Sequence, residues 1–469
     1  MAATGTDKTP RPLSTTAEPA TPSPPFTGAP LFPLPSAEPT SLAPNVKLQA
    51  PLTRRGHGPG LLLVVPAPVA AGGLGRIEEE ETKEEEVHLD PSPLVKWAEE
   101  GYAVLQVEVE ATSAGAGKAK ETEKEGGGWA IEKVLDEGVK RLLEMKECSS
   151  ERVGIIVYEP TALDKLLVAL MSFPHFKCLV TFSSFWEEPA IPTLQHLSLD
   201  DPKASLTAPT STALPPSSET GGSGSSTPTV PTKSFTYPAS SPYFALPDRK
   251  ETYQAHPAAV AHSRTLEFLK KREHLGGPVF DLETLWDEHT YYEFQERSAE
   301  KTLAAEPYVN HIPTLTGGIG RADLTKFYRD VFIPSNPKDS EIHLISRTVG
   351  VVDEFIFTMT HDQSVPHILP GIPPTGKKLE FPVVSVVSFR GDRLFSEHIH
   401  WDQSTVLSQL SLLPSHMPCA SPSTDGKEPL VRLPVSQGAE AAKKLGHGQA
   451  VKSNEMLEEG WGREGAKKG

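Results

Sequence analysis

Short apolar runs alternate with segments of helical spacing through the first half of the chain. The apolar runs occupy residues 61–65, 102–109, 153–158 and 178–182, and the helical segments between them occupy 93–98, 131–143 and 162–171. Strands and helices in this order favour a parallel sheet with helices packed on its faces. The continuous apolar character of the runs is typical of strands buried on both sides. The sequence therefore predicts an α/β fold for this half of the chain.

Polar, low-complexity segments interrupt this pattern. The 469 residues include 46 prolines, many of them in residues 1–45 and 202–232, where Pro is combined with Ser and Thr. Such segments bury too little apolar surface to fold, so we expect a disordered N-terminal arm and a disordered insertion. Residues 78–86 are mostly Glu, which indicates a solvated loop. The first domain is accordingly expected over residues 46–275.

Net charge and cysteine usage exclude several classes of protein. The formal charge is −16 at pH 7, which argues against binding to nucleic acid or to an anionic membrane. The three cysteines, Cys148, Cys178 and Cys419, form no C-x-x-C pair, so neither a zinc ribbon nor a disulfide scaffold is expected. The sequence has no signal peptide and no stretch of about 20 apolar residues. We expect a cytoplasmic protein without a metal or another cofactor.

The second half of the chain has a different order of elements. Helical patterns over 282–304 and 322–331 precede strand patterns over 342–349, 351–360, 380–389 and 394–401. Helices followed by an antiparallel run of strands indicate an α+β domain. A strongly curved sheet wrapped against such helices forms a cone-shaped barrel with a blind apolar cavity. Cavities of this kind hold small ligands.

The last two of these strands form a hairpin that carries chemically active side chains. After a turn at residues 390–392, His398, His400 and Asp402 alternate with bulky apolar residues. Alternation places the two imidazoles and the carboxylate on one strand face. That face can transfer protons if it lines the cavity, and it is an ordinary polar face if it meets water. We expect it to face inward, with the following helix covering the apolar set on the outside.

The first domain resembles dienelactone hydrolase, a small α/β-hydrolase. The resemblance is carried by residues 89–104 and by the strand R-V-G-I-I-V-Y at 152–158. The family continues this strand into a G-Y-C-x-G-G turn whose Cys is the nucleophile. Here Glu159 stands at the position of that Cys, and Pro242 stands at the position of the family's His. The resemblance implies the fold and a scaffold or pseudoenzyme role, and Glu159 acting with another base such as His175 is the alternative.

The second domain, over residues 278–415, resembles the SnoaL-like domains of the nuclear-transport-factor-two superfamily. The resemblance is carried by the hairpin and by stretches at 306–314, 317–321, 352–361 and 369–377, the last of which reads L-P-G-I-P-P-T-G-K. Members of the superfamily include polyketide cyclases, epoxide hydrolases and isomerases, and also proteins without catalysis. The cyclases use a cavity Asp as acid or base next to a carbonyl group, and Asp402 matches that residue best.

The resemblance implies a set of functional residues in the second domain. Asp402, His361 and His398 are the expected catalytic residues, and His311 and His400 are expected to bind a small molecule. The resemblance also allows a homodimer through this domain. Structural alternatives remain open for three of these residues. Asp402 can be the N-cap of the helix after it. His311 can be a structural His whose ring is hydrogen-bonded in a turn, and His361 can face solvent.

Two functions fit this organisation. The first is a small-molecule enzyme, in which the SnoaL-like domain carries out acid/base chemistry on a carbonyl or lactone substrate and is fused to an inactive hydrolase-like domain. The second is a non-catalytic ligand-binding or scaffold protein in which both domains are inactive. Residues 416–469 regain apolar character at 430–435 and 438–445, so we expect a tail that docks in part on the second domain.

Overall fold

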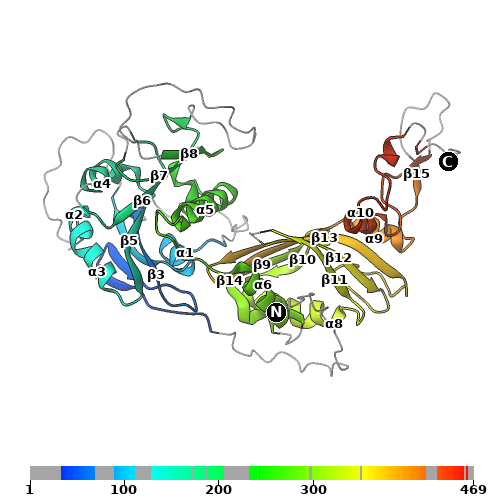
Figure 1. Ribbon diagram of the computed structural model, residues 1–469. Helices are drawn as coiled ribbons and strands as arrows, with labels where there is room; N and C mark the ends of the chain where they lie inside the picture. The colour runs from blue at the N-terminus through cyan, green and yellow to red at the C-terminus, as the bar shows by residue number, and fades with distance from the viewer. Residues whose placement is uncertain are drawn as a thin grey trace, which may run out of the picture. The chain divides into compact units, whose positions relative to one another are not determined.

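The chain folds into two compact units, each built around its own sheet (Figure 1). The first unit is Leu34–Phe280, and the second contains Asp281–Gly469. The computed structural model describes residues 33–68, 89–110, 128–170, 173–185, 189–204, 232–239, 241–294, 298–348, 351–418, 430–458 and 461–462. No helix within these ranges is both long enough and apolar enough to cross a bilayer.

The first unit contains an eight-stranded sheet in the order β1-β2-β4-β3-β5-β6-β7-β8. Its strands are β1 (Thr40–Ala43), β2 (Val46–Gln49), β3 (Gly58–Pro66), β4 (Ala103–Val109), β5 (Cys148–Val157), β6 (Phe176–Thr181), β7 (Thr193–Leu197) and β8 (Thr232–Thr236). The strands from β3 to β8 pair in parallel, whereas β1 and β2 are antiparallel at one edge. Strands and helices alternate along the chain, as the sequence predicts for an α/β protein.

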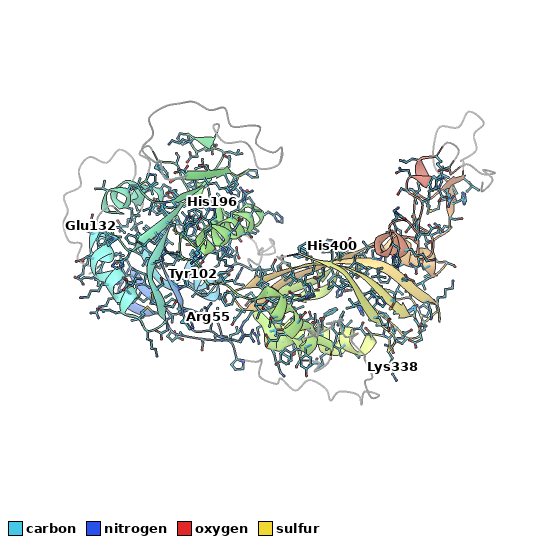
Figure 2. All side chains as sticks on the ribbon, viewed as in Figure 1. Arg55, Tyr102, Glu132, His196, Lys338 and His400 are labelled. Atoms are coloured by element: carbon cyan, nitrogen blue, oxygen red, sulfur yellow. The ribbon has the colours of Figure 1, made fainter. Side chains whose placement is uncertain are left out.

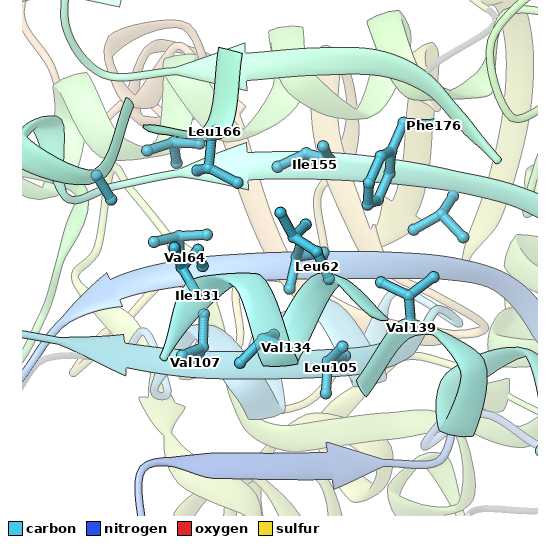
Figure 3. Packing of buried hydrophobic residues seen from close by; sticks show 14 of the residues in the cluster. Leu62, Val64, Leu105, Val107, Ile131, Val134, Val139, Ile155, Leu166 and Phe176 are labelled. Carbon is cyan, nitrogen blue, oxygen red and sulfur yellow. The ribbon is translucent and has the colours of Figure 1, made fainter. Parts of the chain in front are cut away.

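Helices cover both faces of this first sheet. They are α1 (Pro93–Glu99), the continuous segment α2 (Ile131–Lys133), η1 (Val134–Gly138) and α3 (Val139–Glu144), then η2 (Pro160–Ala162), α4 (Leu163–Leu170), η4 (Pro242–Ala245) and α5 (Ala255–Lys270). In β3, Leu62 and Val64 pack with α2, η1 and α3 on one face (Figure 3), and Leu61 and Leu63 pack on the other. Because alternate side chains of a strand point to opposite faces, β3 is buried on both sides.

The second unit contains a mixed, six-stranded sheet in the order β10-β9-β14-β13-β12-β11. Its strands are β9 (Leu303–His311), β10 (Thr316–Ile319), β11 (Glu341–Arg347), β12 (Val352–Thr360), β13 (Lys378–Arg390) and β14 (Arg393–Trp401). All neighbours are antiparallel except β9 and β14, which pair in parallel. The hairpin of β13 and β14 turns at Gly391, whose φ of 58° lies in the left-handed region that glycine adopts readily.

Helices lie against both faces of the second sheet. We call inner the face toward which Asp353 and Glu397 point, and outer the face that carries Ile356. The remaining elements are α6 (Leu282–Phe294), η5 (Ala299–Thr302), α7 (Gly320–Phe327), η6 (Tyr328–Phe332), α8 (Ile333–Ser335), α9 (Gln403–Gln409), β15 (His416–Pro418), β16 (Leu430–Arg432), α10 (Glu440–Gly446) and η7 (Glu455–Leu457). Helix α6 packs on the inner face through Trp286. Helix α10 packs on the outer face, where a Cβ at Gly446 would meet the Ile356 side chain at 3.3 Å.

Two element boundaries differ from the sequence-based expectations. The helix expected over 282–304 ends at Phe294, and the chain enters β9 at Leu303, because pairing with β14 overrides the local pattern. The arm expected to be disordered through residue 45 contains β1, whose backbone groups pair with β2. Composition does not reveal such edge pairing.

Several expected features lie outside the described residues. These are residues 1–32 of the arm, the acidic run at 78–86 and residues 205–231 of the expected insertion.

Candidate functional site

The inner side of α6 carries polar side chains into the interior of the second unit. Trp286, His289 and Glu293 are spaced i, i+3 and i+7, so they share one helix face, and all three are buried. The helix begins beside Asp281, whose carboxylate accepts hydrogen bonds from the backbone N–H and the hydroxyl of Thr284. Buried polar and ionisable groups are costly unless they find partners within the protein.

Asp353 on β12 is a fully paired acid of the inner face. Arg347 on β11 donates two hydrogen bonds to its carboxylate, at 2.7 and 2.8 Å, and Trp286 Nε1 donates a third at 2.9 Å. The remaining Arg347 nitrogen contacts Asp287 at 3.1 Å. All three guanidinium nitrogens are therefore engaged by carboxylates, and the positive charge is neutralised within this group.

Glu397 on β14 and Glu293 on α6 form a pair of buried acids. Glu397 accepts a hydrogen bond of 2.8 Å from the Ser385 hydroxyl. The pKa of Glu397 is raised to about 7, chiefly by burial. The hydrogen bond from Ser385 opposes this rise, and the charge of Asp353 adds to it. Burial also raises the pKa of Glu293 well above its ordinary value, and the charge of Glu397 adds to the rise. The pair therefore keeps a proton at neutral pH.

Two buried polar atoms in this part of the second unit have no hydrogen-bond partner among the described residues. They are the Tyr328 hydroxyl and Nε2 of His289. Tyr328 is 2% exposed, and its pKa is raised by burial and then by the charges of Glu293 and Glu397, so the hydroxyl stays protonated. The ring centroids of His289 and Tyr328 lie 6.3 Å apart. Buried polar atoms are nearly always hydrogen-bonded, so both atoms have hydrogen-bonding capacity left for a further group.

The surroundings of His289 determine which of its nitrogens carries the proton. Nδ1 lies 2.6 Å from Thr302 Oγ1, and the Thr302 hydroxyl donates to the Ala299 carbonyl at 3.0 Å. Since the Thr302 proton points to that carbonyl, it is Nδ1–H of His289 that donates to Thr302. Burial lowers the pKa of His289 to about 3, so the ring is neutral and Nε2 is a lone-pair acceptor.

We call Glu293, Glu397, Tyr328 and His289 the inner cluster. A carboxyl with a pKa near 7 can take up and return a proton at physiological pH. A phenol and a protonated carboxyl can both donate hydrogen bonds to an oxygen that gains negative charge. The arrangement is thus equipped for proton transfer beside a polarised oxygen. Across the described ranges, no three His, Cys, Asp or Glu side chains come together in a group suited to a metal ion.

Glu293, Glu397 and Tyr328 are not among the functional residues expected from the sequence. A usable pattern is present in α6, where Glu293 extends the apolar helix face begun by Trp286 and His289. A carboxylate on a face that otherwise buries rings needs a reason. Glu397 is harder to predict from the sequence, because only the alternation of side chains along β14 directs it to the inner face.

The structure places Asp402 away from the inner cluster. Its side chain is exposed and caps α9, accepting hydrogen bonds from the backbone N–H of Ser404 at 3.0 Å and of Thr405 at 3.2 Å. The expected inward orientation of Asp402 is therefore wrong, and its contacts are those of the helix cap that the sequence left open. A catalytic role of Asp402 stays a prediction.

His398 and His400 lie on the outer face, one residue out of phase with Glu397. His400 (labelled in Figure 2) is exposed, and His398 Nε2 lies 2.9 Å from the Tyr308 hydroxyl. The expectation that the histidines face inward is wrong, because the opposite set includes Ile399, which packs in the apolar interior. Burying apolar area decides the orientation of the strand.

His311 and His361 are both buried, in different surroundings. His311 on β9 has the rings of Phe332 and His367 at centroid distances of 5.7 and 5.4 Å, and burial lowers its pKa to about 4. His361 follows β12, and its Nδ1 lies 3.1 Å from the Thr375 hydroxyl, so it anchors the loop with the L-P-G-I-P-P-T-G-K stretch. It does not face solvent. The binding role of His311 and the catalytic role of His361 stay predictions.

In the first unit, Glu159 and the segment around Pro242 meet at the end of β5. Glu159 caps η2, accepting hydrogen bonds from the Thr161 N–H at 3.0 Å and the Thr161 hydroxyl at 2.8 Å. Tyr243, next to Pro242, donates to the other carboxylate oxygen at 2.9 Å. Both oxygens are thus engaged in holding two chain segments together. His175 lies beside Val153, toward the opposite end of β5, so the two do not form a catalytic pair.

Part of the chain is similar in fold to solved structures of SnoaL-like and NTF2-like proteins. A candidate SnoaL-like polyketide cyclase from Jannaschia sp. CCS1 matches at 18% identity and a TM-score of 0.24, over 29% of this chain and 99% of its own. A candidate polyketide cyclase from Acidithiobacillus ferrooxidans matches at 22% identity and a TM-score of 0.22, over 29% and 97%. An NTF2-like protein of unknown function from Burkholderia pseudomallei matches at 16% identity and a TM-score of 0.21, over 28% and 96%.

These likenesses cover less than a third of the chain and concern its fold alone. No family model matches the chain, and no curated protein matches it.

Proposed function

We propose that the second unit is a small-molecule enzyme that uses the inner cluster for acid/base chemistry at a carbon next to a carbonyl group. One observation carries the proposal: the charges of a pair of buried acids act on the Tyr328 hydroxyl, which lacks a partner among the described residues, and the ring of His289, whose Nε2 also lacks one, lies near the Tyr328 ring. A buried polar atom without a partner costs about 1–3 kcal/mol of folding free energy. Such strain is typical of functional sites.

Each residue of the inner cluster has its own role in this proposal. Glu397 is the general base, because a pKa of about 7 lets it accept a proton from an activated carbon at neutral pH. Tyr328 donates a hydrogen bond to the carbonyl oxygen as it gains negative charge, and the carboxyl of Glu293, whose pKa is raised by burial, acts beside it in its protonated form. His289 orients the substrate by accepting a hydrogen bond at Nε2. The proton held by Glu397 then returns to the product.

The first unit takes part in this proposal as a hydrolase-like scaffold without activity. The parallel strands from β3 to β8, with helices on both faces, support the hydrolase-like assignment. The contacts of Glu159 with Thr161 and Tyr243 support inactivity, because they occupy both oxygens of the only group at the nucleophile position.

A non-catalytic ligand-binding protein is the second candidate. It is favoured by His289, whose pKa of about 3 suits the holding of a ligand better than the transfer of a proton. The two candidates share one site and differ in whether a proton leaves the bound molecule.

Exchange of α-protons in D2O tests the proposal. The full-length protein is incubated with ketones, β-keto esters and lactones, and the loss of the α-proton signal is followed by NMR. Glu397→Gln keeps the shape and removes the base, so we expect exchange to slow by about 100-fold or more. Glu354→Gln is the matched control, since Glu354 lies on the outer face of the strand that carries Asp353, and it should leave the rate unchanged.

The pH profile gives a second readout. Exchange should rise as the pH passes about 7, where Glu397 ionises, and this rise should be absent in Glu397→Gln. If exchange survives Glu397→Gln and disappears in Asp402→Asn, the base is Asp402, as expected from the sequence, and the proposal for Glu397 is wrong. Binding of the compounds without any exchange would favour the non-catalytic candidate.

A further inference from the structure

The turn η5 is held in place by side chains from other elements of the second unit. It is a 3-10 helix of four residues, and Ser298 at its N-cap contributes no side-chain hydrogen bond. A turn this short leaves most of its carbonyl groups without a partner inside the helix, and buried carbonyl groups need one. Donors from outside the turn supply these hydrogen bonds.

Two buried arginines provide most of the donors, and we call them the η5 clamp. Arg321, at the start of α7, donates from Nη1 to the Leu303 carbonyl at 3.0 Å and from Nη2 to the Glu300 carbonyl at 3.3 Å. Arg393, at the start of β14, donates from Nη1 to the Lys301 carbonyl at 3.2 Å. The two arginines are 6% and 9% exposed. Successive carbonyl groups of the turn are thus fixed from two separate elements.

Thr302, the last residue of the turn, connects the η5 clamp to His289. Its hydroxyl donates to the Ala299 carbonyl at 3.0 Å and presents a lone pair to Nδ1 of His289 at 2.6 Å. Because a hydroxyl has one proton, the direction of its own hydrogen bond decides which group donates in the bond to the ring. In a neutral imidazole, the hydrogen bond at one nitrogen decides the state of the other.

Trp286 fixes the plane of the same ring. Its indole stacks on His289 with 5.5 Å between the ring centroids and 18° between the planes, and its Nε1 donates to Asp353 at 2.9 Å. A stacked imidazole can still flip within its plane and exchange the positions of its nitrogen and carbon atoms. The stack therefore does not choose which nitrogen carries the proton, and the Thr302 hydroxyl does.

We propose that Arg321 and Arg393 are positioning residues. By holding η5 they keep the Thr302 hydroxyl where it retains the ring proton of His289 on Nδ1, and Nε2 is left as an acceptor. The inference rests on the proposed function, because it gives the means by which His289 is kept ready to orient a substrate. A pair of arginines that only stabilised the turn would have no effect on the tautomer of this ring.

The tautomer of His289 can be measured directly in the full-length protein labelled with ¹⁵N at histidine. Two-bond ¹H–¹⁵N correlation spectra at pH 7 distinguish a protonated nitrogen from one with a lone pair, and His289→Gln identifies the signals by their loss. We expect at least about 90% of the wild-type rings to carry the proton on Nδ1 alone. A proton on Nε2, or protons on both nitrogens, would overturn the proposal without any further variant.

Variants test each link between the η5 clamp and the ring. Thr302→Val removes the acceptor for Nδ1–H. Arg321→Lys keeps the charge, but a single ammonium group does not span two carbonyls as the planar guanidinium does. Each change should lower the Nδ1–H population to about half or less, whereas Thr302→Ser should retain the wild-type tautomer. Arg390→Lys is the matched control, because Arg390 is also 6% exposed and lies over the Phe395 ring at 3.8 Å, and it should leave the tautomer unchanged.

An unchanged tautomer in Arg321→Lys would overturn the role of the η5 clamp. If that variant does not fold, Arg393→Met gives the same readout, because it removes the donor to the Lys301 carbonyl and keeps a side chain of similar length.

The tautomer is measured without a substrate, so this inference and the proposed function can fail separately. If the tautomer follows these expectations but the wild type exchanges no α-protons, the positioning stands and the proposed catalysis fails. Under the proposed function, Thr302→Val should raise the KM for exchange at least about fivefold and change kcat less than about twofold, because His289 orients the substrate. An unchanged KM in Thr302→Val would overturn the positioning role and leave Glu397 in place as the base.

Discussion

At the scale of single residues, β14 shows how one position decides the chemistry of a strand. Glu397 points inward and His398 points outward, so two neighbouring side chains serve opposite faces. Alternation in the sequence shows that the two faces differ, but it does not show which one is buried. The apolar partner Ile399 settles the question in the folded chain, because the interior gains more from an apolar side chain than from an imidazole.

Asp402→Ala should lower the free energy of unfolding by about 1 kcal/mol, because the start of α9 loses its cap. Asp402→Asn should keep most of the stability, since Asn caps helices about as well as Asp. Both variants should retain α-proton exchange. Urea denaturation and the exchange assay measure the two properties separately. An Asn variant of normal stability without exchange activity would show that Asp402 is catalytic after all.

At the scale of elements, the sequence predicts the strands β11 to β14 and the helices α1 and α4, because each has a strong local pattern. It does not predict β9. That strand contains Pro307 and two alanines, which are poor strand formers, and its partner β14 lies far along the chain. The candidate site was missed for a related reason: Glu293 and Glu397 come together only through the packing of α6 on the sheet.

The contact between Glu159 and Tyr243 makes a prediction about the first unit. Glu159→Ala should lower the free energy of unfolding by about 1–3 kcal/mol, because the Tyr243 hydroxyl and the Thr161 N–H lose their acceptor. Tyr243→Phe should add little in the Glu159→Ala background, which a double-mutant cycle measures. Additive effects of the two changes would contradict a direct contact. Loss of an aryl esterase activity in Glu159→Ala would contradict the proposed inactivity.

At the scale of the whole molecule, buried titratable groups give the second unit opposing responses to pH. His289, His311 and His367 have pKa values lowered by burial to about 3, 4 and 3, so their contribution to stability is present above pH 6.5 and is lost as the pH falls. Glu293 and Glu397 have raised pKa values. Their contribution is fully present below pH 4.5 and is lost as the pH rises, for Glu397 through about 7.

The alkaline side of this response can be isolated at Glu397. Between pH 4.5 and 8, the stability of the wild-type second unit relative to Glu397→Gln should fall by about 3 kcal/mol, because a carboxyl with a pKa near 7 must ionise in a buried place. Hydrogen exchange at increasing urea concentration, read by mass spectrometry on peptides from β12 to β14, reports on this unit alone. A difference between wild type and variant that stays constant with pH would mean that Glu397 titrates normally.

Helix α10 has a consequence for synthesis of the chain. Helix α10 covers Ile356 on the outer face of the second sheet. The last strand of that sheet, β14, ends at Trp401, whereas α10 ends at Gly446, 45 positions later in the chain. At the usual rate of translation, about 2–9 s pass between these two points. During that interval Ile356, a buried apolar side chain in the folded unit, stays uncovered on the nascent sheet.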